Sequence, residues 1–169
     1  MLAFQNGSRE AFEELFARYR APIFGFFVRR ISVRNRAEDL VQETFTAVVH
    51  GARRYKPTAL VRTWLYSIAL KQISNERRRQ GRSTTISLSE TLAEPPDGRD
   101  EALWIRQALG ALDPDEREIL LLREYEQLSY QEIAELLKIP VNTVRSRLFR
   151  ARMALKESLD PLQRAKGAR

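Results

Sequence analysis

The chain has 169 residues, and its 43% hydrophobic and 30% charged content is ordinary for a folded globular protein. It has no cysteine and one histidine, which excludes disulfides, thiolate metal sites and histidine clusters, so we expect no metal and no cofactor. The net charge of +7 indicates a polyanionic partner, although unevenly placed solubilising charge would give the same total. No apolar run approaches the ~20 residues that span a bilayer. The N-terminus lacks the regions of a signal peptide, so we expect neither membrane insertion nor a cleaved leader.

The N-terminal part of the chain, residues 1–80, reads as helices throughout and is strongly basic, with 15 basic and 7 acidic residues. Ser8 is a candidate N-cap for the first helix, and Pro22 is expected to kink or divide that helix. Further helices are predicted at about 36–55 and about 58–79.

The predicted helix at 36–55 has an outward face that does not suit DNA. The residues expected to point outward are polar or acidic, with one exposed apolar side chain: Asp39, Gln42, Glu43, Thr46 and Val49. An acidic face in a basic domain indicates a protein partner. The alternative is that acidic residues in the first turn only stabilise the helix dipole.

The next predicted helix and the segment before it carry a different mixture. A polar strip contains Ser67, Lys71, Ser74 and Arg78, with Asn75 beside it. Upstream, Tyr55 lies among cations that include Lys56, a composition that can bind a single strand by stacking and phosphate contacts. Tyr55 would either stack on a base or pack at a helix end, whereas Trp64 is expected in the core.

A linker is predicted at 81–100, where serine, threonine, glycine and proline replace the helical period. A structureless connection of this length is uncommon inside one compact domain, so we predict two domains. Four more helices are predicted, at about 100–111, 114–126, 130–138 and 141–159. The fold class is therefore all-α: two small helical domains joined by a flexible linker.

Two local signals define the C-terminal domain. Asp113 followed by Pro114 is typical of a helix start, and Ser129 with Glu132 forms a capping box. The break at 138–140 then separates two short helices, which predicts a helix-turn-helix.

The second helix of this motif has the composition of a recognition helix. Its core stripe contains Val144, Leu148, Ala151 and Leu155. The opposite face and its flanks contain Asn142, Thr143, Arg145, Ser146, Phe149, Arg150, Arg152 and Met153, with Arg147 nearer the core. Cations and hydroxyls would bind phosphates while central residues touch base edges. A solvated amphipathic helix is the alternative, but it leaves Phe149 unexplained.

Together these segments resemble the extracytoplasmic-function (ECF) sigma factors of bacterial RNA polymerase, within the sigma-70 family. The resemblance is carried by AEDLVQETF (37–45), RTWLYSIA (62–69) and LDPDEREILLLREYEQLSYQEIAELLKIPVNTVRSRLFRAR (112–152). It implies a region 2 domain at 1–80, a linker at 81–100 and a region 4 domain at 101–169.

The resemblance also implies site residues. It assigns the binding of core polymerase to Asp39, Leu40, Gln42 and Glu43. Recognition and opening of the −10 element fall on Tyr55, Lys56, Lys71, Asn75 and Arg78. Contacts with the −35 element fall on Thr143, Arg145, Ser146, Phe149, Arg150 and Arg152. Lys71 stands where the family often has asparagine, Asn75 where it has aspartate, and Asn142 where it has glycine.

The implied function is promoter selection in transcription initiation, in response to stress or envelope signals. The implied partners are core RNA polymerase, through its β′ clamp and β flap, promoter DNA and an anti-sigma factor that holds the cytoplasmic protein inactive, in some cases at the inner membrane. No small-molecule substrate and no C-terminal regulatory domain are expected. A stand-alone helix-turn-helix regulator is the alternative, and it would leave residues 1–80 unexplained. An enzyme is not expected, because no convergent set of catalytic residues is visible.

Overall fold

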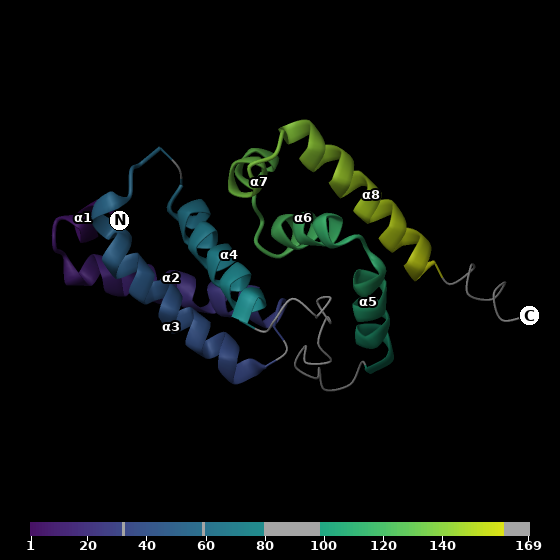
Figure 1. Ribbon diagram of the computed structural model, residues 1–169, viewed down its shortest axis with the longest axis horizontal. Coiled ribbons are helices and arrows are strands. Elements are labelled where there is room, and N and C mark those ends of the chain that lie inside the picture. Colours follow the sequence, from purple (N-terminus) through teal and green to yellow (C-terminus); the bar gives the residue numbers. More distant parts are fainter. Residues whose placement is uncertain (32, 59, 80–98, 161–169) are drawn as a thin grey trace, which may run out of the picture. The chain divides into compact units, whose positions relative to one another are not determined.

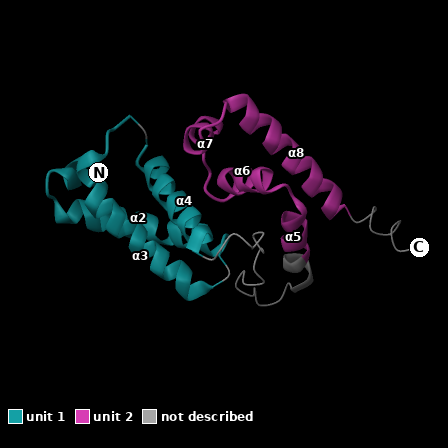
Figure 2. Cartoon of the chain, in the orientation of Figure 1, with its two compact units in different colours: residues 1–92 teal, residues 93–169 magenta. Residues whose placement is uncertain are grey.

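The protein is described by a computed structural model that covers residues 1–31, 33–58, 60–79 and 99–160. Every regular element in these ranges is a helix, which confirms the all-α prediction (Figure 1). The chain divides into two compact units, Met1–Leu92 and Ala93–Arg169 (Figure 2). Nearly all of the predicted linker at 81–100 lies outside the described residues.

The first unit is a small bundle built around α3. Its elements are α1 (Leu2–Gln5), α2 (Arg9–Val28), α3 (Arg34–Gly51), the 3-10 turn η1 (Ala52–Arg54) and α4 (Val61–Arg79). Helix α3 packs against both α2 and α4, and α2 also contacts α4 (Figure 1). The largest fully buried side chains of this core are Ile23, Phe26, Phe27, Leu40, Val48, Leu65 and Ile73. These three helices fix the orientation of the outward face of α3.

Local sequence signals account for the start of α2 but not for its length. The Ser8 hydroxyl accepts a hydrogen bond from the Ala11 backbone N–H at 3.1 Å, so the predicted N-cap is confirmed. Pro22 lies inside α2, which continues to Val28, so the segment is not divided there. Neighbouring Ile23, Phe26 and Phe27 are fully buried, and we attribute the continuity to this packing.

The described part of the second unit, residues 99–160, contains four helices, and the last of them contacts the other three. Its elements are α5 (Arg99–Ala111), α6 (Pro114–Glu124), α7 (Tyr130–Leu137) and α8 (Val141–Leu159). Both predicted start signals are present. The Asp113 carboxylate accepts hydrogen bonds from two backbone N–H groups of α6, and Ser129 and Glu132 form the complete capping box of α7. The core includes Ile119, Leu122, Leu128, Ile133, Val144 and Leu148.

The turn between α7 and α8 makes the predicted helix-turn-helix. Lys138 has the left-handed conformation, with φ 56° and ψ 46°, and Pro140 is the N-cap of α8. The Ile139 N–H donates to the Ala134 carbonyl at 3.1 Å, which closes the end of α7. No described helix has both the length and the apolar character needed to cross a membrane.

Candidate nucleic-acid and polymerase interfaces

The outer face of α8 presents an aromatic ring among cations, as predicted. Phe149 is 66% exposed, although it lies on a helix whose opposite side is fully buried through Val144 and Leu148. Arg145 and Ser146 are also exposed. An exposed phenylalanine gains nothing from the core of this unit, so the face is suited to a ligand with apolar and anionic groups.

The arginines of α8 do not all lie free in solvent. Three of them form ion pairs with carboxylates of α6: Arg147 with Asp115 at 2.9 Å, Arg150 with Glu116 at 2.5 Å and Arg152 with Glu124 at 2.7 Å. The hydrogen bond that Arg152 donates to Glu124, with a smaller contribution from Tyr130, raises the pKa of Arg152. The fourth, Arg145, donates within its own helix to the Asn142 amide oxygen at 3.3 Å. The predicted −35 residues of α8 are all exposed except Thr143, which is half-buried.

The polar strip of α4 is exposed along its length. Ser67, Lys71, Ser74 and Arg78 follow one another at helical spacing and all face solvent. Arg78 donates to the Asn75 side-chain oxygen at 2.7 Å, so these two predicted −10 residues are in direct contact. The strip offers hydroxyls and cations over several turns, which suits a polyanionic backbone.

Tyr55 is not on the surface. Its side chain is 8% exposed, and its ring lies 5.2 Å from that of Trp64, at an angle of 59° between the planes. The sequence left open whether Tyr55 stacks on a base or packs at a helix end, and in the structure it packs against Trp64. Lys56, the next residue, is exposed. In this arrangement Tyr55 supports the segment that precedes α4. Of the two predicted −10 residues in that segment, Lys56 is exposed and Tyr55 is buried.

The Gln5 side chain anchors the same segment to the N-terminus. Its amide nitrogen donates to the backbone carbonyls of Ala52 and Tyr55, at 2.7 and 2.8 Å. Helix α1 contacts η1 and also packs on α2, where the Phe4 and Phe12 rings lie 5.0 Å apart. The start of the chain therefore fixes the turn from which the predicted −10 segment begins.

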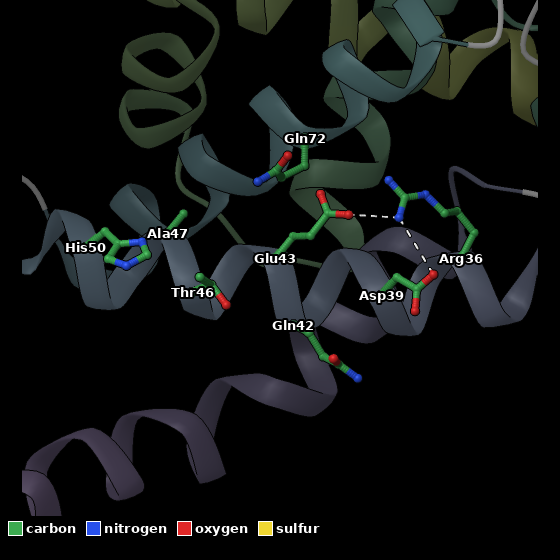
Figure 3. A pocket seen from close by; sticks show the side chains of 8 residues that line it. All are labelled: Arg36, Asp39, Gln42, Glu43, Thr46, Ala47, His50 and Gln72. Atoms are coloured by element: carbon green, nitrogen blue, oxygen red, sulfur yellow. Dashed lines mark hydrogen bonds and ion pairs between the residues drawn. The ribbon is translucent and has the colours of Figure 1, made fainter.

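The outward face of α3 carries the predicted polymerase-binding residues, with one exception. Asp39 and Gln42 are exposed and Glu43 is half-buried, but Leu40 is 1% exposed and belongs to the core. An open hollow lies along this face (Figure 3). It is lined by Arg36, Asp39, Gln42, Glu43, Thr46, Ala47 and His50 of α3 and by Gln72 of α4. Figure 3 shows Glu43 pointing toward Arg36 and Gln42 pointing the other way.

Arg36 links this face to α4. Its guanidinium donates to Glu76 of α4 at 2.7 and 3.0 Å and to Glu43 at 2.8 Å, and it lies 3.7 Å from Asp39. The hydrogen bond with Glu76 is the main cause of a raised pKa at Arg36, so this cation persists throughout the neutral range. The network leaves the Glu43 carboxylate in a fixed position at the edge of the hollow.

The sequence did not predict that Gln5, Arg36 and the carboxylates of α6 contact the predicted site residues or the segments that carry them. Arg36 and Glu43 are seven residues apart and so lie on one face of a helix, and this spacing could have predicted their contact. The contact with Glu76 spans 40 residues, and those between α6 and α8 span about 30, so no local pattern predicts them. Among the described residues, no group of three or more His, Cys, Asp or Glu side chains is placed to hold a metal ion.

Two family models match the two units of the chain. The model described as Sigma-70 region 2 matches residues 15–83, and the one described as Sigma-70, region 4 matches residues 102–155. The first match includes the outer faces of α3 and α4, and the second includes the whole helix-turn-helix.

Similar proteins of known family extend over nearly the whole chain. The RNA polymerase sigma-H factor of Pseudomonas aeruginosa is 34% identical, over 95% of this chain and 92% of that protein. The sigma factor CarQ of Myxococcus xanthus is also 34% identical, over 96% and 97%. The ECF RNA polymerase sigma-E factor of Haemophilus influenzae is 32% identical, over 94% and 92%.

Solved structures agree with these relatives. CnrH, in its complex with the cytosolic domain of CnrY, has a TM-score of 0.72 at 27% identity and covers 92% of both chains. The sigma factor RpoE of Bartonella quintana, solved with the anti-sigma factor NepR, has a TM-score of 0.71 at 23% identity over 89% of this chain and 97% of that one, which shows the shared fold. The chain belongs to the sigma-70 family, in its extracytoplasmic-function group, and is a sigma factor that directs core RNA polymerase to promoters rather than a stand-alone regulator.

Proposed function

We propose that the two units bind different elements of one promoter, with residues 1–80 as the region 2 domain and residues 101–169 as the region 4 domain. The observation that carries the proposal is the outer face of α8, where a 66% exposed phenylalanine lies among arginines on the second helix of a helix-turn-helix. The sigma-70 family models that match both units support it.

In the region 4 domain, α8 would enter the major groove of the −35 element. Phosphates and base edges would be contacted by Thr143, Ser146 and three of the four arginines, and Phe149 would contact a thymine methyl group or a sugar. The assigned residues are Thr143, Arg145, Ser146, Phe149, Arg150 and Arg152. Arg145 donates a long, exposed hydrogen bond to Asn142 of its own helix, so it can leave that contact for DNA at little cost.

In the region 2 domain, the exposed strip of α4 would follow the backbone of the −10 element. Lys56, Lys71, Asn75 and Arg78 would contact the strand directly. Tyr55 would hold the recognition segment in place through its packing on Trp64, and it could stack on a base only after leaving that contact. The direct contacts are electrostatic, so we expect −10 binding to weaken with added salt.

The acidic outward face of α3 would bind the β′ clamp of core polymerase through Asp39, Gln42 and Glu43. Leu40 would support the face from the core. A surface of carboxylates and an amide on an otherwise basic domain is suited to a protein partner with complementary charge and poorly suited to DNA. The region 4 domain would in turn contact the β flap.

We further propose that an anti-sigma factor controls this protein by covering its polymerase- and DNA-binding faces. RpoE of Bartonella quintana has been solved with the anti-sigma factor NepR, and CnrH with the cytosolic domain of CnrY. The protein would act in the cytoplasm, be held at the inner membrane when its anti-sigma factor is anchored there, and respond to stress or envelope signals. It would have no enzymatic activity of its own and need no cofactor.

The −35 assignment is tested with holoenzyme reconstituted from this chain and bacterial core RNA polymerase. Promoters are first selected from a library with a randomised −35 element. Arg145→Ala should then lower binding to the selected promoters by about tenfold, since one good base or phosphate contact is worth ~1–3 kcal/mol. Arg147→Ala is the matched control, because Arg147 lies nearer the core and pairs with Asp115; we expect it to reduce binding by less than about threefold.

Two results would contradict the assignment. One is a selection that yields no preferred −35 sequence. The other is an equal loss of binding for both variants, which would mean that α8 contributes only diffuse positive charge.

A further inference from the structure

The ion pairs between α6 and α8 differ in how much water reaches the carboxylate. Glu116, the partner of Arg150, is 14% exposed, whereas Glu124, the partner of Arg152, is 48% exposed. A mostly buried carboxylate is costly unless it is paired and hydrogen-bonded, so the contact of Glu116 with Arg150 persists. An exposed pair is transient and screened by salt. Arg150 is therefore fixed in place, while Arg152 can exchange its partner.

The contact with Glu116 uses Nε of Arg150 and leaves its two terminal nitrogens available for another ligand. The Glu116 oxygen accepts from Nε of Arg150, and the Arg150 side chain is 58% exposed. Guanidinium carries five N–H donors in a planar fork, of which Nε provides one. Four donors remain on the two terminal nitrogens. By contrast, Arg152 uses a terminal nitrogen, Nη2, for Glu124.

An arginine fixed through Nε is suited to bidentate recognition. Reading a guanine edge, or binding a phosphate side-on, takes two parallel donors at a defined angle. A side chain that is already oriented loses little conformational entropy when it makes that contact. Arg150 also belongs to the predicted DNA-binding surface, because its side chain is itself exposed on α8.

We propose that Glu116 is a positioning residue for promoter discrimination, which acts by orienting the guanidinium of Arg150 toward one base pair of the −35 element. Glu116 itself does not contact DNA. The inference rests on the proposed function of Arg150. It predicts that the carboxylate of Glu116 increases sequence discrimination, although a negative charge beside DNA by itself lowers affinity for every sequence.

The test compares Glu116→Gln with Glu124→Gln in reconstituted holoenzyme. Each variant removes one negative charge from α6, so the general gain in DNA affinity is matched between them. Binding is measured on the selected promoter and on a series with single changes across the −35 element. Glu116→Gln should reduce discrimination at one position by about tenfold, whereas Glu124→Gln should change it by less than about twofold.

A second variant separates orientation from folding. Glu116→Asp keeps the charge in the first turn of α6 but withdraws the carboxylate from Nε. We expect it to lose discrimination at the same position while its melting temperature stays close to that of the wild type. Equal discrimination in wild type, Glu116→Gln and Glu116→Asp would overturn the inference.

Arg150→Ala distinguishes this failure from failure of the proposed function. If Arg150→Ala reduces discrimination and the Glu116 variants do not, the positioning role alone is wrong. If Arg150→Ala also leaves discrimination unchanged, Arg150 does not read the −35 element, and both the assignment and the inference are overturned.

Discussion

At the scale of single residues, Arg36 makes the contacts that join the proposed polymerase-binding face of α3 to α4. Its side chain is 23% exposed and that of Glu76 is 12% exposed. Arg36→Met removes the cation but keeps much of the side-chain volume. We expect the free energy of unfolding to fall by about 2 kcal/mol, because hydrogen bonds between charged groups are lost and a poorly solvated carboxylate loses its cation. Urea denaturation followed by circular dichroism measures the change.

Arg18→Met is the matched control for this prediction. Arg18 pairs with Glu14 at 2.7 Å, but both side chains are about two-thirds exposed, so the loss should be below about 0.5 kcal/mol. Since the pKa of Arg36 is raised, its stabilisation is present below that pKa and would be lost only as strong alkali is approached. The difference between the two variants should therefore stay constant across neutral pH. An equal effect of both variants would show that the Arg36 network is only a surface ion pair.

At the scale of elements, α1 shows how a very short helix can fix a functional segment. Four residues cannot form a stable helix alone, and α1 is held by the Phe4–Phe12 contact and the hydrogen bonds from Gln5. Gln5→Glu keeps the shape but replaces the donor with an acceptor beside two carbonyls. We expect a loss of about 1–3 kcal/mol in unfolding free energy and slower promoter opening, measured by permanganate reactivity of thymines at the −10 element.

The Gln5→Met variant should lie between wild type and Gln5→Glu, because it removes the donor without adding a repulsive charge. Binding to a −35 duplex by the same holoenzymes should be unchanged in both. Normal opening and stability in Gln5→Glu would mean that α1 does not support the segment before α4.

The helices themselves were predicted within a few residues wherever a local signal marks their ends. Ser8, Asp113 and Ser129 cap helices as expected, because N-capping depends on a side chain and the backbone of the next turn. Helix α1 was missed because four residues show no period. Pro22 does not divide α2, and we attribute this to the burial of neighbouring side chains, which offsets one lost hydrogen bond.

At the scale of the whole molecule, the sequence predicted which side chains are exposed and which are buried, but it did not predict the contacts between helices. Helical periodicity placed Phe149 outside and Val144 and Leu148 inside, and the structure agrees. Leu40 lies in the core, although the family resemblance assigned it to polymerase binding. The partners of Arg36, Arg150 and Arg152 come from other helices, so they depend on how the helices pack and no local pattern reveals them.

The central claim is that this chain finds promoters as a subunit of RNA polymerase. The most direct measurement compares the binding of labelled protein to bacterial core RNA polymerase with its binding to duplex promoter DNA in the absence of polymerase. We expect tight core binding that falls by more than tenfold when Gln42 and Glu43 are both replaced by alanine, a loss of at least ~1.4 kcal/mol. Replacing Glu13 and Glu14, exposed on α2, should leave core binding unchanged, and binding to DNA alone should be weak. Failure to bind core polymerase, together with tight sequence-specific binding to duplex DNA alone, would contradict the account.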